Sequence, residues 1–497
     1  MVSEGLALGA TVVTLVCLAA IGIGYSRGRI GSVDDYTTSR GTTGTGTTAA
    51  TVLASSMGAW ILFSPAEAGA AFGGLSAVAG YAVGSASAAL VYVFLGPRIR
   101  RLVPEGRTIT EYALVRYGRA MYVYVLVVSV LYMFMALAAN MTGIVGVLSL
   151  VAEVPPWQTA ALVGGFVLLY TAYGGLKASI VTDTVQLIVI LPALGLVFVA
   201  TLLALGGPSE ARTTVAATDP TLLDPGFLPG LLFGVYVVIA IVGAELLNQA
   251  WWQRVYAAEH VRTVRRSYAL AGVLTVPVVL VAGLFGVLAA GHGLVTVPGD
   301  ASVALFALAL EVLPEWLLVV LVVLALVLVT SSIDTLFNAI ASVVAADLPR
   351  AVGLSDRSLR TVGRLATVVV ALGATAIGAQ SYSVLELFLT ADLFAVATAV
   401  PLLAGLYTGR IGGRGVLAAA VFGLAVGVAF MPTLSPVLGL VVPTGILPEP
   451  SFLHAFVGAA AASTVATVAL QALGFSRFDL GRLSTEIVAT EELVADD

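Results

Sequence analysis

The sequence predicts an all-helical protein that crosses a membrane about thirteen times. Of its 497 residues, 59% are hydrophobic and only 10% are charged, and the mean hydropathy is +1.04. A soluble globular chain is apolar over about 45 to 50% of its residues. The apolar residues also fall into long runs, and a run of about 18 residues is enough to cross the hydrocarbon core. These observations exclude a soluble globular fold.

The predicted spans follow one another along nearly the whole chain, separated by short polar loops. We expect residues 1–475 to form one transmembrane domain and residues 476–497 to form an acidic cytoplasmic tail. The approximate limits of the spans are 4–24, 47–73, 76–97, 120–150, 157–175, 179–206, 229–255, 266–290, 302–345, 361–379, 384–408, 415–432 and 453–474.

The basic residues predict the orientation of these spans. The chain has 23 Lys and Arg residues, and with thirteen spans all of them except Arg212 fall in loops on one side. Basic residues are enriched in cytoplasmic loops. We therefore expect a multi-pass protein of the plasma membrane, with its N-terminus outside and its C-terminus in the cytoplasm.

The sequence gives little indication of an enzyme active site. Cys17 is the only cysteine, the three histidines form no metal-binding pair, and "GTTGTGTTAA" at 41–50 lacks the lysine of a phosphate-binding loop. We expect no enzymatic activity. The expected partners are a small organic solute and the lipid bilayer, with neither nucleic acid nor an obligate protein partner.

Two predicted spans are interrupted by helix-breaking and polar residues. Non-helical backbone at membrane depth persists only where protein or a water-filled cavity satisfies it, so such breaks predict a binding site. The two spans begin five spans apart, which predicts two inverted five-helix repeats at about 47–206 and 229–408. The interrupting residues are Gly58, Ser64, Pro65, Glu67 and Gly69 in span 47–73, and Gly243, Glu245, Asn248 and Gln249 in span 229–255.

A third span carries a polar cluster within "VLVTSSIDTLFNAIASVVAADL", residues 327–348. An ionised carboxylate at the centre of a bilayer costs about 2.5 to 3.5 kcal/mol on insertion scales, so the cluster needs an explanation. Ser331 and Ser332 place two hydroxyls at one level of the helix. They either face a ligand or bond back to carbonyls four residues earlier. Asp334 either contributes to a cation site or is protonated and hydrogen-bonded to a neighbouring helix.

Five stretches make the chain resemble the sodium:solute symporter family over nearly all of residues 1–475. They are "DDYTTSRG", "LASSMGAW", "YTAYGGLKASIVTDTVQ", "NQAWWQR" and "VTSSIDTLFNAIASVVAADL". The resemblance implies a leucine-transporter-like core of five plus five helices with one extra N-terminal and two extra C-terminal helices. It also implies alternating access with sodium as the coupling ion.

The resemblance further implies where sodium binds. Sodium is a hard cation that prefers oxygen ligands, which hydroxyls and unwound backbone carbonyls supply at the bilayer centre. The main sodium site implied for this chain consists of Ala54, Met57, Leu328, Ser331 and Ser332. A possible second sodium site consists of Ser55, Asp183, Asp334 and Thr335.

Three acids point to the solute. Glu67, Glu245 and Asp392 fall near the expected centre, together with Asn248, and carboxylates sharing one cavity repel each other unless a cation or protons intervene. This favours an amine-bearing solute, such as an amino acid like proline, or betaine. Alternatively, Glu67 satisfies backbone freed by Pro65, or the acids face other helices.

The expected function is therefore secondary active transport, in which sodium and a small organic solute move together by alternating access. A solute exchanger would use the same fold without net sodium flux. A membrane sensor that acts with a separate partner is a second alternative. The sequence by itself leaves these alternatives open.

Overall fold

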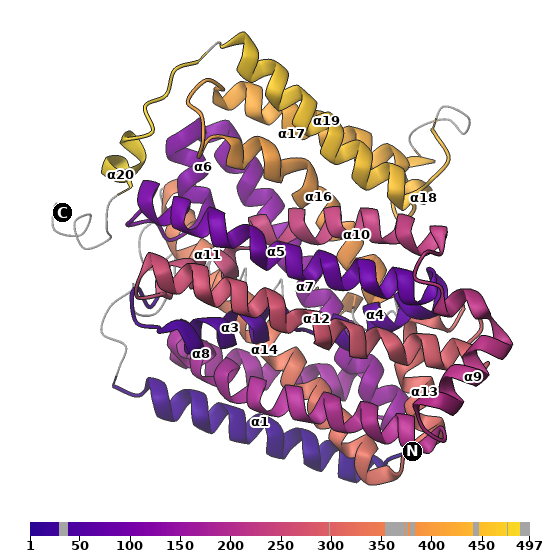
Figure 1. The fold of residues 1–497 in the computed structure, drawn as a ribbon. Coiled ribbons are helices and arrows are strands. Elements are labelled where there is room, and N and C mark those ends of the chain that lie inside the picture. Colours follow the sequence, from indigo (N-terminus) through magenta and orange to yellow (C-terminus); the bar gives the residue numbers. More distant parts are fainter. Residues whose placement is uncertain are drawn as a thin grey trace.

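The computed structural model describes residues 1–28, 38–297, 299–352, 373, 376–377, 383–440, 447–474 and 476–487. It is a bundle of helices that run side by side, with α1 (Glu4–Ser26) along one edge and α17 (Gly413–Phe430) and α19 (Phe452–Leu473) along the opposite edge (Figure 1). In the described part, ten helices are long and apolar enough to cross a membrane, and one bent pair makes an eleventh. The prediction of an all-helical, multi-pass membrane protein is confirmed.

The bent pair is α3 (Thr45–Ser56) and α4 (Trp60–Ala71), which meet at an angle of 60°. The helix stops at Met57, whose backbone is extended (φ −94°, ψ 102°). The break therefore lies at the "SMGA" part of the predicted segment. Ser64 and Pro65, which the sequence also marks as interrupting residues, lie inside α4 instead.

The second predicted break separates α10 (Leu228–Leu247) from α11 (Gln249–Ala257). Asn248 alone is non-helical there (φ −67°, ψ 110°), and its side chain accepts a hydrogen bond from the backbone N–H of Ala250. Asparagine is a favoured residue at this position because its side chain satisfies an N–H that the first turn leaves free. Both interrupted spans thus contain a real break.

The structure refines two of the predicted limits. Spans 157–175 and 179–206 correspond to α8 (Pro156–Ala204), in which the non-helical Gly175 (φ 53°, ψ −153°) separates two helical segments. Span 302–345 is two helices, α13 (Ala304–Val312) and α14 (Glu315–Val352). Pro314 lies between them and has no N–H with which to continue a helix. Predicted span 361–379 lies almost entirely outside the described residues, so the count of thirteen stays a prediction.

Tight contacts between small residues hold α5 (Gly74–Leu102) against α10 and α12 (Val261–Gly291). A side chain at Gly80 of α5 would begin 2.4 Å from the Cα of Gly234 in α10. Glycine lets the two backbones approach at this closeness, as small residues do between membrane helices. The remaining elements are α6 (Ile109–Tyr117), α7 (Arg119–Ala152), α9 (Pro208–Thr218), η1 (Pro220–Leu223), η2 (Ala301–Val303), α16 (Val384–Ala404), α18 (Ser435–Leu438) and α20 (Arg482–Glu486).

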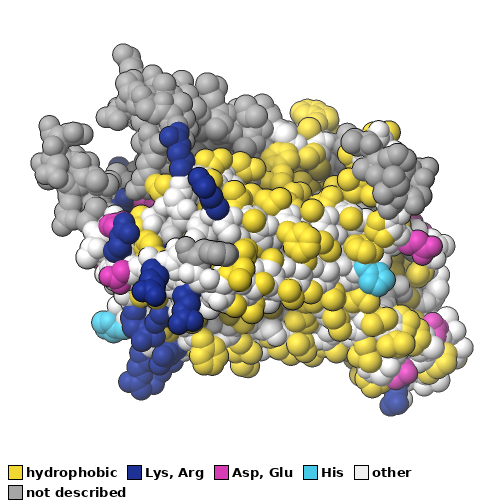
Figure 2. All heavy atoms as spheres, turned by 90° about the horizontal axis from the view of Figure 1, so that it is seen from above, with side chains coloured by type: hydrophobic (Ala, Val, Ile, Leu, Met, Phe, Trp, Pro, Cys, Tyr) yellow, Lys and Arg dark blue, Asp and Glu magenta, His cyan; other side chains and the backbone are white. Residues whose placement is uncertain are grey.

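The two ends of the bundle differ in charge. Lys and Arg side chains gather mainly at the left-hand end in Figure 2. The C-terminal helix α20 lies at the same end, whereas the N-terminus lies at the other (Figure 1). Residues 476–487 pack on the bundle, since Leu483 is fully buried and Phe478 lies 4.6 Å from the guanidinium of Arg116. The rest of the predicted acidic tail, residues 488–497, lies outside the described residues.

Candidate functional site

The break between α3 and α4 lies between α7 and α14 and contacts both helices. The backbone N–H of Ala59 donates to Oδ1 of Asn140 in α7 at 3.0 Å. A side chain at Gly58 would begin 2.5 Å from that oxygen and 2.7 Å from Oγ of Ser332. Glycine is therefore required here by close approach rather than by an unusual backbone angle. The contacts hold the unwound backbone directly against the polar cluster of α14.

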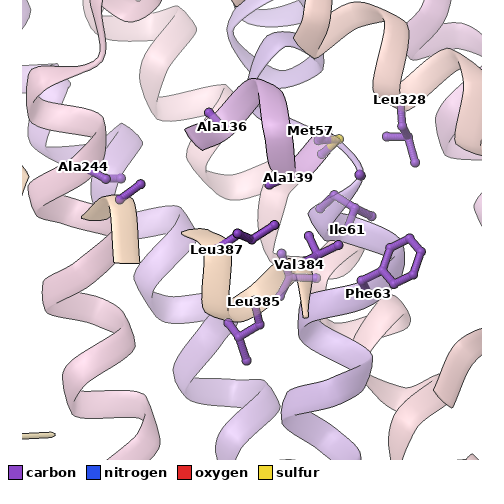
Figure 3. Close-up of a cluster of buried hydrophobic side chains, with 14 of the residues drawn as sticks. Met57, Ile61, Phe63, Ala136, Ala139, Ala244, Leu328, Val384, Leu385 and Leu387 are labelled. Carbon is purple, nitrogen blue, oxygen red and sulfur yellow. The ribbon is translucent and has the colours of Figure 1, made fainter. Parts of the chain in front are cut away.

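The serine pair of α14 meets this break. The hydroxyl of Ser332 donates to the backbone carbonyl of Met57 at 3.3 Å, and the hydroxyl of Ser331 donates to Oδ1 of Asp183 in α8 at 2.6 Å. Both hydroxyls thus reach outside α14 instead of bonding to the carbonyls four residues earlier. Figure 3 shows Leu328 of α14 projecting beside the segment that carries Met57. Ser332 and the Met57 carbonyl can therefore contact the same small cation.

The other members of the predicted main sodium set lie at the same junction. Ala54 is in the last turn of α3, where its carbonyl accepts from the N–H of Met57 at 3.0 Å. Ala54 and Leu328 are both fully buried. The five predicted residues therefore come from two elements that the structure places in contact.

A buried ion pair lies next to Ser331. Nη2 of Arg254 in α11 is 3.2 Å from Oδ2 of Asp183, and neither side chain is exposed at all. The same Asp183 oxygen accepts from the hydroxyl of Thr51 in α3 at 2.5 Å. Nη2 of Arg254 also donates to Oγ1 of Thr335 in α14 at 2.9 Å. The pair thus links four helices.

The sequence analysis counted Arg254 among the basic residues on the cytoplasmic side and identified no partner for it. A signal was available, because Arg254 falls inside predicted span 229–255 and an arginine at membrane depth requires an acidic or polar partner. Asp183, an acid in another predicted span, was the matching residue. Their pairing also explains why Asp183 is tolerated in the interior.

The four residues of the predicted second sodium site bond to different partners. Asp183 and Thr335 both contact Arg254. Asp334 accepts hydrogen bonds from Ser179 at 2.8 Å and Thr182 at 3.3 Å, both in α8. Of the alternative in which Asp334 is protonated and hydrogen-bonded to a neighbouring helix, the structure shows the hydrogen bonds. Ser55 donates to the carbonyl of Val52 in its own helix at 3.3 Å.

A cavity lies between the two broken helices, with about 60 Å³ of space open to water-sized molecules. In the described part of the chain, the charged residues of its lining are Glu245 of α10 and Asp392 of α16. They are joined by aromatic side chains that sequence reasoning did not select, although Trp60 ends the "LASSMGAW" stretch. The residues around the cavity are Val52, Ser56, Trp60, Tyr81, Ser85, Ala89, Tyr132, Ile241, Ala244, Glu245, Trp251, Ala271, Thr275, Phe388 and Asp392.

The remaining residues assigned to the solute have other partners. Asn248 donates to Oε2 of Glu245 at 2.8 Å and thereby orients this carboxylate. Glu67 does not line the cavity, and its carboxylate accepts from the hydroxyl of Ser383 at 2.9 and 3.1 Å. Ser383 precedes α16 by one residue and lies about 13 Å from Asp392 along the helix axis, at 1.5 Å per residue. Two of the three acids therefore share the cavity.

Helices broken at membrane depth, with hydroxyls at the break and a cavity between them, define a secondary transporter. The chain belongs to the sodium:solute symporter family, whose model matches residues 36–423. Family membership makes the protein a transporter of a small solute that uses sodium ions, and not an enzyme. The resemblance inferred from the sequence is confirmed.

Two curated relatives are transporters. A spermidine transporter of Candida albicans is 24% identical over 369 residues, which are 74% of this chain and 69% of the relative. The sodium/pantothenate symporter of Escherichia coli is 30% identical over 145 residues, which are 27% of this chain and 30% of the relative.

Solved structures share the leucine-transporter-like fold. A Na+-coupled sialic acid symporter in a substrate-bound, outward-open state has a TM-score of 0.76 at 16% identity, covering 95% of this chain and 98% of the other. The nucleobase-cation-symport-1 family transporter Mhp1 in a closed conformation has a TM-score of 0.56 at 13% identity, covering 92% and 99%. The predicted fold is confirmed.

Proposed function

We propose that the protein carries a small amine-bearing cation together with sodium. The observation that carries this proposal is that Glu245 and Asp392 line one buried cavity, and that no basic side chain is among the described residues that line it. Two buried carboxylates in one cavity repel each other when both are ionised. A bound ammonium group would offset this repulsion and donate strong, charge-assisted hydrogen bonds to either carboxylate.

The aromatic lining supports the same class of solute. The rings of Trp60 and Tyr81 stack with their centroids 5.5 Å apart, and both line the cavity. The indole N–H of Trp60 donates to the carbonyl of Ser56 at 2.8 Å, which fixes the ring. Cations bind favourably over the faces of Trp and Tyr. Aromatic faces beside two carboxylates suit an amine better than a sugar or a carboxylate.

The N-terminal ends of α4 and α11, the helices that follow the two breaks, favour an amine over an amino acid as the solute. The N-terminal ends of broken helices commonly bind the carboxylate of a solute through free N–H groups. Here the Ala59 N–H at the start of α4 donates to Asn140. At the start of α11, Ala250 donates to the Asn248 side chain and Trp251 to the Asn248 carbonyl. This favours an amine without a carboxylate over proline or betaine. The similarity to a spermidine transporter agrees with it.

We further propose that sodium binds at Ala54, Met57, Leu328, Ser331 and Ser332. The approach of Ser332 to the Met57 carbonyl supports this assignment. Hydroxyls and unwound carbonyls are the ligands with which broken helices hold sodium. The ion would lie between α14 and the α3–α4 break, so its binding would favour one relative position of these elements.

The basic end of the bundle supports an orientation with the N-terminus outside. Lys and Arg gather at the end that carries α20 (Figure 2). Positively charged residues concentrate on the cytoplasmic side of membrane proteins. We therefore propose that α20 faces the cytoplasm.

Uptake by purified protein in liposomes tests the proposed function. We expect an inward sodium gradient to drive accumulation of radiolabelled spermidine, and replacement of sodium by potassium to abolish it. Unlabelled amines should compete, and proline and betaine should compete less. Uptake that is equal in sodium and potassium but accelerated by solute preloaded inside the liposomes would indicate an exchanger. Inhibition by acetate, lactate or glucose without inhibition by amines would contradict the amine assignment.

A further inference from the structure

We propose that Glu67 is a second ammonium site, so that the solute is a straight diamine or polyamine with an ammonium group at each end. One end would bind at Glu245 and Asp392 in the cavity, and the other end would bind at Glu67. This inference rests on the proposed function and narrows its solute class. It concerns an acid that does not line the cavity.

Glu67 is a buried carboxylate whose only hydrogen-bond donor in the described part of the chain is one hydroxyl. Its side chain is 8% exposed, and it accepts from Ser383 at 2.9 and 3.1 Å. No described basic residue pairs with it, and the nearby charge of Glu386 is also negative. An ionised carboxylate accepts about four hydrogen bonds, and buried charges are normally paired. Glu67 therefore suits a cation as its partner.

One face of α4 connects Glu67 with the cavity. Trp60, Ser64 and Glu67 are spaced by four and three residues, which places them on one side of a helix. Trp60 lines the cavity, and Glu67 lies about 10 Å further along the axis, at 1.5 Å per residue. Ser64, between them, is fully buried and lies near Tyr81 of the lining, but its hydroxyl has no hydrogen bond of normal geometry to a described residue. This hydroxyl can accept a hydrogen bond from an inner nitrogen of a polyamine.

Helix α16 runs between the same two points. Its start packs against α4 (Figure 3), and Ser383, which bonds to Glu67, lies about 13 Å along the axis from Asp392. The two acid sites are therefore about 10 to 13 Å apart. The end nitrogens of spermidine, and of diaminooctane with an amine at each end, are nine bonds apart, or about 11 Å when extended. Both molecules are long enough to reach the two sites together.

Pairs of competitors that differ only at one end test this proposal. We would measure how diaminooctane, and aminooctanol with a hydroxyl in place of one amine, inhibit uptake of radiolabelled spermidine into liposomes. In the native protein, diaminooctane should inhibit at an about tenfold lower concentration, because a charge-assisted hydrogen bond exceeds a neutral one. Diaminopropane spans only about 5 Å and should have no such advantage over aminopropanol.

Three variants locate the second ammonium. Glu67→Gln removes the charge, so it should abolish the advantage of diaminooctane and leave inhibition by aminooctanol unchanged. Ser383→Ala removes the neutral donor but keeps the charge, so the advantage should persist. Glu311→Gln is the matched control, because Glu311 is an exposed acid of α13, a helix that packs against α4. It should behave as the native protein does.

The outcomes separate the inference from the proposed function. Equal inhibition by diaminooctane and aminooctanol in the native protein would overturn the inference, and so would an unchanged advantage in Glu67→Gln. Loss of the advantage in Ser383→Ala as well would show that the pair is a structural contact. If Glu67→Gln does not fold, the native protein decides, since an equal advantage for short and long diamines would contradict a distant second site. Inhibition by none of the amines would contradict the proposed function itself.

Discussion

Ser332 of α14 donates its hydroxyl hydrogen to the backbone carbonyl of Met57, which lies in the break between α3 and α4, at 3.3 Å. These residues are separated by most of the two repeats, so their contact joins the two halves of the predicted core. It places an unwound carbonyl and a buried hydroxyl at one point, where a sodium ion can replace the hydrogen bond by ligating both oxygens. The predictions below start from this junction.

Removing either hydroxyl should weaken sodium binding. In Ser331→Ala and Ser332→Ala, the loss of one buried oxygen ligand should cost about 1 to 3 kcal/mol. The sodium concentration for half-maximal uptake should rise about fivefold to 150-fold. Ser463→Ala is the control, because this hydroxyl of α19 bonds only within its own helix, to the Ala460 carbonyl. Unchanged sodium dependence in both α14 variants would place the ion elsewhere.

A side chain added at Gly58, where the backbone lies close to Asn140 and Ser332, should weaken the proposed sodium site. The added methyl group of Gly58→Ala would lie 2.5 Å from Oδ1 of Asn140 and 2.7 Å from Oγ of Ser332, so one of these must move. We expect the purified variant to bind radioactive sodium more weakly than the native protein in a scintillation-proximity titration. Gly146→Ala provides the comparison, since its nearest neighbour would be 3.6 Å away on Phe63. Equal sodium affinity in the two variants would contradict this account of the break.

The buried ion pair should show strong coupling in stability measurements. Asp183→Asn leaves the Arg254 charge buried without its partner, which typically costs about 3 to 5 kcal/mol. Thermal unfolding in detergent should therefore begin at a clearly lower temperature. The double variant Asp183→Asn/Arg254→Gln removes both charges and should unfold at a higher temperature than Asp183→Asn alone. Additive effects of the two substitutions would show that the pair contributes no coupling.

Neutralising the cavity acids should affect charged solutes more than neutral ones. Glu245→Gln and Asp392→Asn each remove one charge from the cavity lining, and a charge-assisted hydrogen bond is about twice as strong as a neutral one. Spermidine uptake should need a higher spermidine concentration in both variants. Glu67→Gln should have a smaller effect, because Glu67 bonds to Ser383 outside the lining. Glu4→Gln, an exposed position in α1, should have none.

Labelling of introduced cysteines with a membrane-impermeant thiol reagent can test the orientation. Native Cys17 is exposed and is first replaced by Ser. Ser209→Cys should then react in intact cells, whereas His260→Cys should react only after permeabilisation. Both positions are exposed, and they lie on opposite sides of the membrane in the proposed topology. The reverse pattern would place the N-terminus in the cytoplasm.

Much of the architecture follows from local sequence. Apolar runs predicted the helices because the hydrocarbon thickness sets the length of a span. Gly58 and Asn248 were among the residues that marked the two breaks, because glycine and asparagine are poorer helix formers than most residues. Adjacent Ser331 and Ser332 were a visible pair of hydroxyls at one helical level. Pro314 also indicated that span 302–345 divides into two helices. The sequence analysis treated it as one span because the residues on both sides of Pro314 are apolar.

Only the tertiary structure decided which polar groups meet. Asp183 and Arg254 lie 71 residues apart, on α8 and α11, and helical periodicity relates a residue to neighbours three or four positions away but not to another helix. The same limit applies to Glu67, which pairs with Ser383, and to Glu245 and Asp392, which share a cavity. A sequence shows that a buried charge needs a partner, because desolvation makes the unpaired charge unfavourable. The packing of the helices determines which partner it has.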